Sequence, residues 1–229
     1  LGLPVPLGGS SNHFRTDVLR EVGGWDPYNV TEDADLGFRL ARFGYRSVMF
    51  PSTTYEEAPA RFGAWLRQRS RWMKGWMQTW SVHMRLPRQL WRDAGPGGFF
   101  TLNIFVGGNV LTALAHPLLI GEILVRAVMS LFDDSVTSFF EKPFIELYLA
   151  TIAAGYLTTM VIGLIGLAKR GLLAESWVLL LTPVYWICLS IAAWRALYQF
   201  LTEPYRWEKT EHGLARHSRI AASIRNQKT

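Results

Sequence analysis

Cysteine is almost absent from this chain of 229 residues, because Cys188 is the only one. A single cysteine excludes a disulfide-stabilised scaffold, and no cluster of cysteine and histidine has the spacing of a zinc site. Charge is also scarce, since charged residues make up 18% of the chain against roughly 25% in ordinary soluble domains. Hydrophobic residues make up 49%, which excludes an intrinsically disordered chain, because so much apolar surface cannot stay solvated.

Three segments have no formal charge at all: residues 99–121, 147–168 and 176–194. About 20 residues, each rising 1.5 Å along a helix, cross the hydrocarbon of a bilayer, so these segments predict helices that span a membrane. We therefore expect a membrane region over residues 99–201 with two to four apolar helices, and a lipid bilayer as its surroundings.

Acidic residues are missing from another part of the chain, residues 58–92, which contain eight basic residues. Residues 122–146 show the opposite bias, with two basic and five acidic residues. Because cytoplasmic loops carry the excess of Lys and Arg, we expect residues 1–98 and the C-terminal tail in the cytoplasm, with the chain in the inner membrane of the cell. Three complete crossings would leave the two ends on opposite sides.

We favour an arrangement in which one apolar segment does not cross, with residues 176–201 as the candidate. They contain Pro183 and several Trp and Tyr residues, which prefer the level of the lipid headgroups, so we expect them to lie in the interface or to re-enter. The alternative is a break of the 99–131 region at His116 and Pro117.

The N-terminal part reads as soluble α/β structure. Residues 1–57 mix five basic with eight acidic residues among glycines and prolines. We predict a short helix over residues 18–22, a helix over 31–43 with one buried face formed by Leu36, Leu40 and Phe43, and a strand over 47–50. Gly44 is a plausible C-cap of the second helix.

Four parts are therefore expected. Residues 1–60 form an α/β part, 61–98 an amphipathic interfacial region, 99–201 the membrane region, and 202–229 a basic cytoplasmic tail. The sequence begins at Leu1, without methionine or a signal peptide, so we expect it to be a piece of a longer protein.

Three carboxylates, Glu32, Asp33 and Asp35, stand at the start of the predicted 31–43 helix. Carboxylates at a helix N-terminus complement the helix dipole, which is a purely structural reason for their presence. One of them could instead face a cleft and accept a proton from a substrate hydroxyl. Composition alone leaves both interpretations open.

A basic, aromatic helix is predicted over residues 62–84, which contain no proline. Gln68, Arg71 and Trp72 fall at i, i+3 and i+4 and share one face. A basic helix with a Trp and Met face is typical of the membrane interface. Guanidinium also binds phosphate bidentately, and an indole ring can stack on a sugar, so one end of the helix could serve a cleft as well.

The combination of Thr31-Glu32-Asp33 with Gln68-Arg69-Ser70-Arg71-Trp72, followed by membrane spans, resembles the processive family-2 glycosyltransferases. These are the membrane synthases of cellulose, hyaluronan and chitin. The resemblance implies that the α/β part is the C-terminal part of a GT-A type glycosyltransferase domain, followed by an amphipathic interfacial helix and α-helical transmembrane segments. It also implies a hexosyltransferase that extends a polysaccharide from a nucleotide sugar, such as a UDP-sugar.

The resemblance further implies roles for individual residues. Asp33 would be the catalytic base, and four residues would bind the acceptor and the diphosphate: Glu32, Gln68, Arg71 and Trp72. In the tail, a gating loop over the nucleotide is expected at Trp207, Lys209 and Thr210. Mg²⁺ or Mn²⁺ is expected in the full-length enzyme with ligands outside this chain, so we expect the 229 residues alone to be inactive.

Two alternatives stay open. One is a non-processive, lipid-linked glycosyltransferase of the same fold, and the other is a non-enzymatic component of a membrane transporter. Nucleic acid would also suit the net charge of +6, but a positive-inside bias already explains basic residues beside membrane spans, so no nucleic-acid partner is expected. The sugar, its linkage and any protein partner cannot be derived from the sequence.

Overall fold

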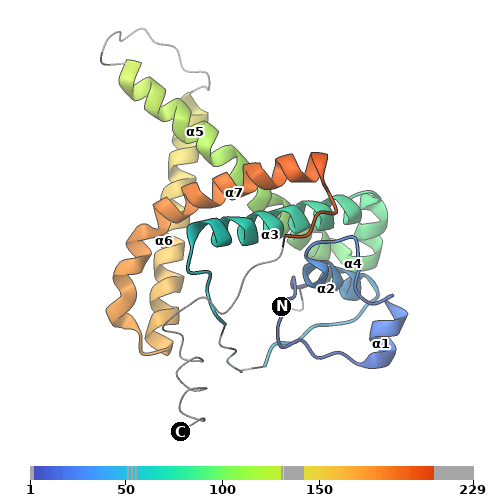
Figure 1. Ribbon diagram of the computed structural model, residues 1–229. Helices are drawn as coiled ribbons and strands as arrows, with labels where there is room; N and C mark the ends of the chain where they lie inside the picture. Colours follow the sequence, from blue (N-terminus) through green and yellow to red (C-terminus); the bar gives the residue numbers. More distant parts are fainter. Residues whose placement is uncertain are drawn as a thin grey trace. The chain divides into compact units, whose positions relative to one another are not determined.

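A computed structural model describes residues 3–208, with the exception of residues 51, 53, 55, 130 and 132–141. Two compact units make up the chain, namely Leu1–Leu111 with Ala192–Thr229, and Thr112–Ile191. Helices form nearly all of its regular structure (Figure 1), and in chain order they are α1 (Thr16–Glu21), α2 (Glu32–Arg42), α3 (Phe62–His83), α4 (Pro87–Thr101), the π-helix η1 (Leu102–Gly108), α5 (Asn109–Met129), α6 (Lys142–Lys169), the 3₁₀-helix η2 (Leu173–Leu181) and α7 (Thr182–Thr202).

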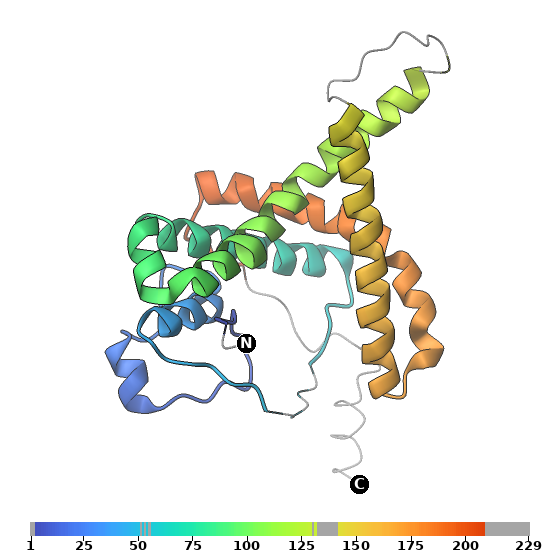
Figure 2. The ribbon, with the colours of Figure 1, turned by 180° about the vertical axis from the view of Figure 1, so that it is seen from behind.

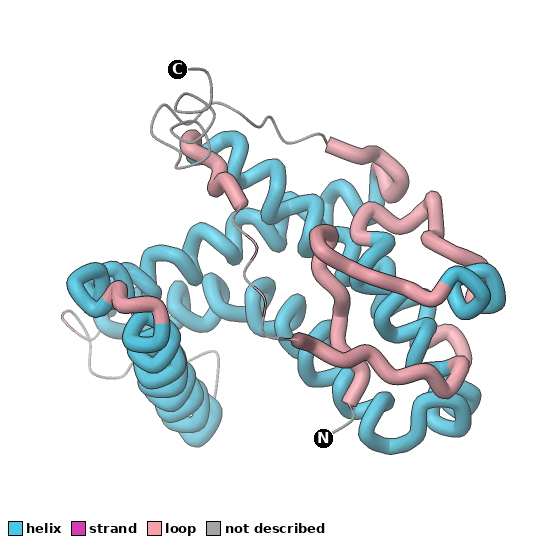
Figure 3. The backbone as a smooth tube through the Cα atoms, turned by 90° about the horizontal axis from the view of Figure 1, so that it is seen from below, coloured by secondary structure: helices cyan, strands magenta, loops and turns pink. Residues whose placement is uncertain are grey.

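The expectation of α/β structure is wrong for the part of the chain that the structure describes, which contains helices and loops but no strand (Figure 3). Residues 47–50, predicted as a strand, have no regular structure, and Val48 and Met49 are 86% and 88% exposed. Residues of high β propensity form a strand only when their backbone pairs with a neighbouring strand. No described segment pairs with these residues, so the expected GT-A sheet is not present here.

The two N-terminal helices form where the sequence predicts them, and a glycine ends α2 as expected. Gly44 has φ +82°, a left-handed conformation that favours glycine. Its N–H donates to Ala41 O at 3.0 Å, and the N–H of Tyr45 donates to Leu40 O at 3.0 Å. This pair of bonds is a Schellman motif, which satisfies carbonyls that the helix end would otherwise leave free.

The first core cluster joins α1 to α2. Leu36 and Leu40, fully or almost fully buried, pack with Val18 and Val22. Phe43 was expected on the same face but is 51% exposed, because the helical geometry ends before it and the residue serves as the C-cap. The prediction of a buried face is therefore right for Leu36 and Leu40 and wrong for Phe43.

A second core cluster connects α2, α4 and η1 through Phe38, Leu90, Leu102 and Val106, each at most 2% exposed. α2 also packs against α3, and η1 packs against both α3 and α4. These four elements therefore share one core (Figures 1 and 2). At Gly37 of α2, a β carbon would overlap the carbonyl of Val5. The absence of a side chain there lets the N-terminal segment run directly across α2.

The first apolar stretch contains two irregularities. α4 kinks at Gly95, which has φ +68° and precedes Pro96. Helix η1 then has π geometry before α5 begins at Asn109. The break considered at His116 and Pro117 is not observed, because α5 runs through both residues without interruption.

Within the described ranges, three helical stretches are long and apolar enough to cross a membrane: Pro87–Met129, Pro143–Lys169 and Leu173–Thr202. In the second stretch, the most apolar part has no residue that is buried inside the protein. A soluble protein rarely exposes so large a continuous apolar surface, so the three stretches are consistent with membrane association. The side on which each end lies stays a prediction.

Aromatic side chains connect the helices of the unit Thr112–Ile191. The hydroxyl of Tyr148 lies 2.7 Å from Nδ1 of His116, and the rings of Tyr156 and Trp186 stack with their centroids 4.5 Å apart. Paired aromatics of this kind add about 0.5–1.5 kcal/mol beyond the area they bury. These contacts join α6 to both α5 and α7, and the ring of His116 also contacts Trp186.

Candidate functional site

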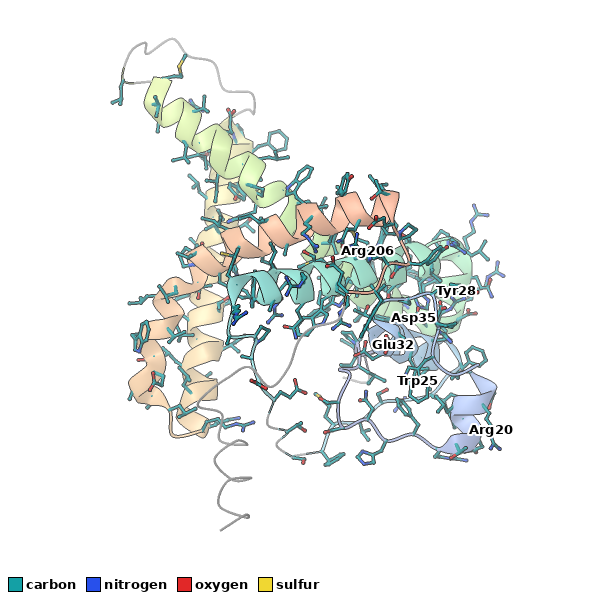
Figure 4. All side chains as sticks on the ribbon, viewed as in Figure 1. Arg20, Trp25, Tyr28, Glu32, Asp35 and Arg206 are labelled. Carbon is teal, nitrogen blue, oxygen red and sulfur yellow. The ribbon has the colours of Figure 1, made fainter. Side chains whose placement is uncertain are left out.

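A pocket of about 650 Å³ lies in the first unit, where α2, α3 and two loops meet. Its walls are residues 6–10, residues 30–34 at the start of α2, Glu56 with Glu57, and the α3 side chains Gln68, Arg71, Trp72 and Trp76. Figure 4 labels two residues of α2, namely Glu32, which lines the pocket, and Asp35, which does not. The five residues predicted for the base and the acceptor and diphosphate site therefore line one cavity: Glu32, Asp33, Gln68, Arg71 and Trp72.

Asp33 is a partly buried carboxylate of the pocket and lies in the first turn of α2. Its Oδ1 accepts a hydrogen bond from the N–H of Ala34 at 2.8 Å. Burial raises the pKa of Asp33, assisted by the charge of Glu32 and opposed by the Ala34 N–H and by Arg71. A β carbon at Gly9 would lie 3.2 Å from Oδ2, so the glycine segment covers this carboxylate closely. A carboxylate with a raised pKa is well suited to accept a proton.

From its position on α3, Arg71 faces the carboxylates of Glu32 and Asp33 on α2. Burial lowers the pKa of its guanidinium, while Glu32 and Asp33 act in the opposite direction. The Nε–H is buried and has no hydrogen-bond partner among the described residues. Buried donors normally have partners, so this arginine retains capacity to bind an anion in the pocket.

The wall of the pocket that α3 forms contains the three residues whose spacing predicted a shared face. Gln68, Arg71 and Trp72 share one side of the helix, and the structure places all three on the pocket. Trp72 is 37% exposed, and the guanidinium of Arg69 lies 4.3 Å from its ring centroid. The indole is thus held by a cation on one face, which leaves a flat aromatic surface at the pocket wall.

The loop before α2 is fixed by buried polar groups of α3. Nδ2 of Asn29 donates to Oγ1 of Thr79 at 2.9 Å, and the N–H of Val30 donates to Oε1 of Gln78 at 3.0 Å. At Gly75, a β carbon would overlap the side chain of Thr31. The loop that leads into α2, and thus to Asp33, therefore lies directly against the backbone of α3.

α3 also holds the segment that follows α7, residues 203–208, through side chains on the face that contacts the α2 loop. Lys74, only 1% exposed, donates to the carbonyls of Glu203 at 3.3 Å and Arg206 at 2.5 Å. The Nε2 of Gln78 donates to Pro204 O at 3.0 Å and to Tyr28 O at 3.2 Å. One glutamine side chain thus connects the α2 loop with segment 203–208.

Trp207 is the one predicted gating residue that the structure describes, since Lys209 and Thr210 lie outside the described residues. Its ring centroid lies 5.4 Å from the guanidinium carbon of Arg71, and the side chain is 56% exposed. The next residue, Glu208, is held by Arg195 through two bonds of 2.8 and 2.7 Å, and these bonds hold the pKa of Glu208 below its usual range. This ion pair fixes Trp207 beside the pocket arginine.

Asp35 has a different role from Asp33, although only one residue separates them. It is 2% exposed and bonds both Arg39 and Nε2 of His83, the latter at 3.1 Å. Arg42 lies 3.3 Å from Nδ1 of His83, and arginine only donates, so the histidine accepts there and donates from Nε2 to Asp35. Burial opposes ionisation of Asp35, but the bonds from His83 and Arg39 outweigh it and lower the pKa.

Sequence reasoning missed the polar residues that support the site, Lys74, Gln78 and His83. They recur on α3 among Trp and Met residues, at positions where an interfacial helix would need no buried polar group. This interruption of the apolar face was the available signal, but the sequence does not show which segments the residues contact.

No group of three or more His, Cys, Asp or Glu residues in the described ranges could hold a metal ion. The carboxylates on the pocket, Glu32, Asp33, Glu56 and Glu57, do not converge on such a group. The described residues therefore offer no ligand set for Mg²⁺ or Mn²⁺, whose ligands the resemblance places outside this chain.

Comparison with known proteins identifies the family of the chain. Residues 1–203 match the family described as Glycosyl transferase family group 2. The chain belongs to this family, which confirms the resemblance at family level. No solved structure matches it.

Three relatives show the range of the similarity. The chain is 35% identical over 68 residues to the "Probable glycosyltransferase YdaM" of Bacillus subtilis, which covers 29% of this chain and 16% of that protein. It is 32% identical over 68 residues to the "Probable glucomannan 4-beta-mannosyltransferase 7" of Oryza sativa, with coverage of 29% and 12%. It is 30% identical over 76 residues to a "Beta-monoglucosyldiacylglycerol synthase" of Trichormus variabilis, with coverage of 32% and 16%. Each alignment thus spans under a fifth of the relative.

Proposed function

We propose that this chain carries the acceptor side of a membrane glycosyltransferase site, in which Asp33 is the base for inverting transfer from a nucleotide sugar. One observation carries the proposal: a single 650 Å³ pocket joins Asp33, whose pKa is raised, to Arg71, whose buried Nε–H lacks a partner among the described residues. Membership of the family supplies the reaction class.

The reaction is one displacement at the anomeric carbon of the donor sugar. The acceptor hydroxyl oxygen forms a bond to this carbon as the bond from the carbon to the diphosphate oxygen breaks. The acceptor proton passes to Asp33, and the nucleoside diphosphate leaves with the bonding electron pair. Removal of the proton in the transition state contributes about 10²–10⁴-fold to the rate in reactions of this kind.

The groups on α3 bind the two substrates in this proposal. Arg71 contacts the departing diphosphate, where a preorganised cation stabilises the charge that develops. Trp72 stacks on the acceptor sugar, and Gln68 and Glu32 bond to hydroxyls at the pocket wall. Trp207 closes over the nucleotide together with Lys209 and Thr210, since stacking and a phosphate contact suit these residue types.

The proposed acceptor is the end of a growing glycan, and the proposed donor is a UDP-sugar. The spacing of Gln68, Arg71 and Trp72 favours this processive reading, and one relative is named for polysaccharide synthesis. A lipid hydroxyl is the second candidate, because another relative is named as a diacylglycerol-based glycolipid synthase. In either case, residues 1–98 and the tail face the cytoplasm in this proposal, because residues 58–92 are basic.

Product analysis tests the proposal. Membranes that contain the whole protein are incubated with a panel of labelled nucleotide sugars, and the products are separated into aqueous polymer and solvent-extractable lipid. We expect label in a polymer much longer than one sugar. Label confined to a lipid that carries one sugar supports the lipid-linked alternative. Absence of transfer with every donor contradicts the proposed transfer activity and leaves the transporter alternative.

A further inference from the structure

A second pocket, of about 390 Å³, lies on α4, at the beginning of the first apolar stretch, Pro87–Met129. It is lined by Pro87, Arg88, Trp91, Arg92 and Phe99. None of these residues lines the pocket of Asp33 and Arg71. We call it the α4 groove.

The α4 groove has positive charge without a counter-charge. Arg88 and Arg92 are four residues apart on one helix and are both exposed, so their guanidinium groups share a face. Neither arginine forms an ion pair with any described residue. The adjacent carboxylate, Asp93, is engaged by Arg42 through bonds of 3.1 and 2.8 Å and does not neutralise them.

Aromatic rings complete the groove. Trp91 is 44% exposed and contacts Phe99 and Phe100 edge-on, with centroid distances of 5.3 and 5.9 Å. Phe100 is itself 53% exposed. Amphipathic indole rings between guanidinium groups and an apolar helix are typical of the boundary between lipid headgroups and acyl chains.

We propose that the α4 groove binds the headgroup of an anionic phospholipid. Arg88 and Arg92 bind the phosphate through charge-assisted hydrogen bonds, and Trp91 with Phe99 contacts the glycerol backbone and the first acyl carbons. Two features select a membrane lipid as the occupant: the unneutralised positive charge, and the continuity of the groove with an apolar stretch long enough to cross a bilayer. This inference rests on the membrane region and is independent of the transfer chemistry.

Native mass spectrometry of the detergent-solubilised chain, titrated separately with phosphatidylglycerol and phosphatidylcholine, tests the inference. We expect tight retention of phosphatidylglycerol and weak retention of phosphatidylcholine. Because one basic group near a membrane contributes about 1 kcal/mol, Arg88→Gln with Arg92→Gln should weaken phosphatidylglycerol binding by about 10- to 30-fold.

The matched control is Arg20→Gln with Arg46→Gln, which removes the same charge from exposed arginines elsewhere; Arg20 is labelled on α1 in Figure 4. This control should bind like the wild type. The pair Arg88→Lys with Arg92→Lys keeps the charge but loses the guanidinium fork, and it should bind with intermediate affinity. This second variant also serves if the glutamine variant does not fold.

Three results overturn the inference. Equal binding of phosphatidylglycerol by the wild type and both groove variants shows that the groove is not the site. Equal loss in the Arg20 and Arg46 control shows attraction by net charge alone. Complete displacement of the lipid by millimolar glycerol 3-phosphate shows a site for a soluble phosphate ester rather than for a membrane lipid.

Discussion

Two aspartates near the start of α2 show how environment separates residues of the same type. Asp33 lines the pocket, and burial raises its pKa. Asp35 is surrounded by His83 and Arg39, whose hydrogen bonds outweigh its burial and lower its pKa. Only the first is suited to accept a proton at a pH where the second is fully ionised.

The pH dependence of the reaction follows from the raised pKa of Asp33. A base acts only when it is deprotonated, so kcat/KM should fall as the pH decreases through this pKa, with the acidic limb above the ordinary value of 3.8. The measurement is a pH–rate profile of the whole protein. Asp17→Asn changes an exposed carboxylate on α1 and should leave the limb in place. A limb at or below 3.8 would contradict the assignment of Asp33.

At the residue scale, the sequence and its resemblance to a known family predicted which side chains would meet at the pocket, but not which would support them. Gln68, Arg71 and Trp72 follow from helical spacing, which is local. Lys74 and Gln78 bond loop carbonyls up to 132 residues away in the chain, and no local pattern specifies such partners.

At the scale of elements, α3 is the support on which the site is built. Its buried polar side chains hold both the loop before α2 and segment 203–208, and Gln78 bonds the two together. Gly75 lies at the closest approach, where the Thr31 side chain occupies the space of a β carbon. The position of Asp33 therefore depends on the absence of a side chain at residue 75.

Gly75→Ala tests this dependence. The added methyl group should push the Thr31 loop away from α3, with a loss of about 1–3 kcal/mol of stability from overpacking and a clear loss of activity. Thermal unfolding in detergent and sugar transfer by the whole protein measure the two effects. Gly63→Ala on the same helix is the control, because its β carbon would meet nothing nearer than 3.8 Å, and alanine favours the helix. Unchanged stability and activity of Gly75→Ala would refute this role of α3.

The elements that sequence predicted correctly are those set by local rules. α2 and α3 follow apolar periodicity, and Gly44 stops α2 by a local conformational preference. The predicted strand over residues 47–50 was wrong because a strand requires a pairing partner, which propensity does not supply. The kink at Gly95 and the π-helix η1 were also unforeseen, whereas the break considered at Pro117 is absent.

At the scale of the whole molecule, the sequence separates a pocket-bearing part from apolar helices. The three charge-free segments, which predicted membrane helices, lie within three described helical stretches that are long enough to cross a bilayer. Their orientation stays a prediction from the charge bias of the residues beside them. The family is clear from residues 1–203, but the acceptor depends on contacts that the pocket residues alone do not specify.

The central claim is that Asp33 is the base of a transfer reaction, and Asp33→Asn in the whole protein tests it most directly. Initial rates of nucleotide release are measured with binding of the nucleotide sugar and thermal unfolding as parallel readouts, and with Asp17→Asn as the matched control. We predict a fall in kcat of about 10²–10⁴-fold, with binding and unfolding close to wild type. Turnover by Asp33→Asn at the wild-type rate would contradict the claim.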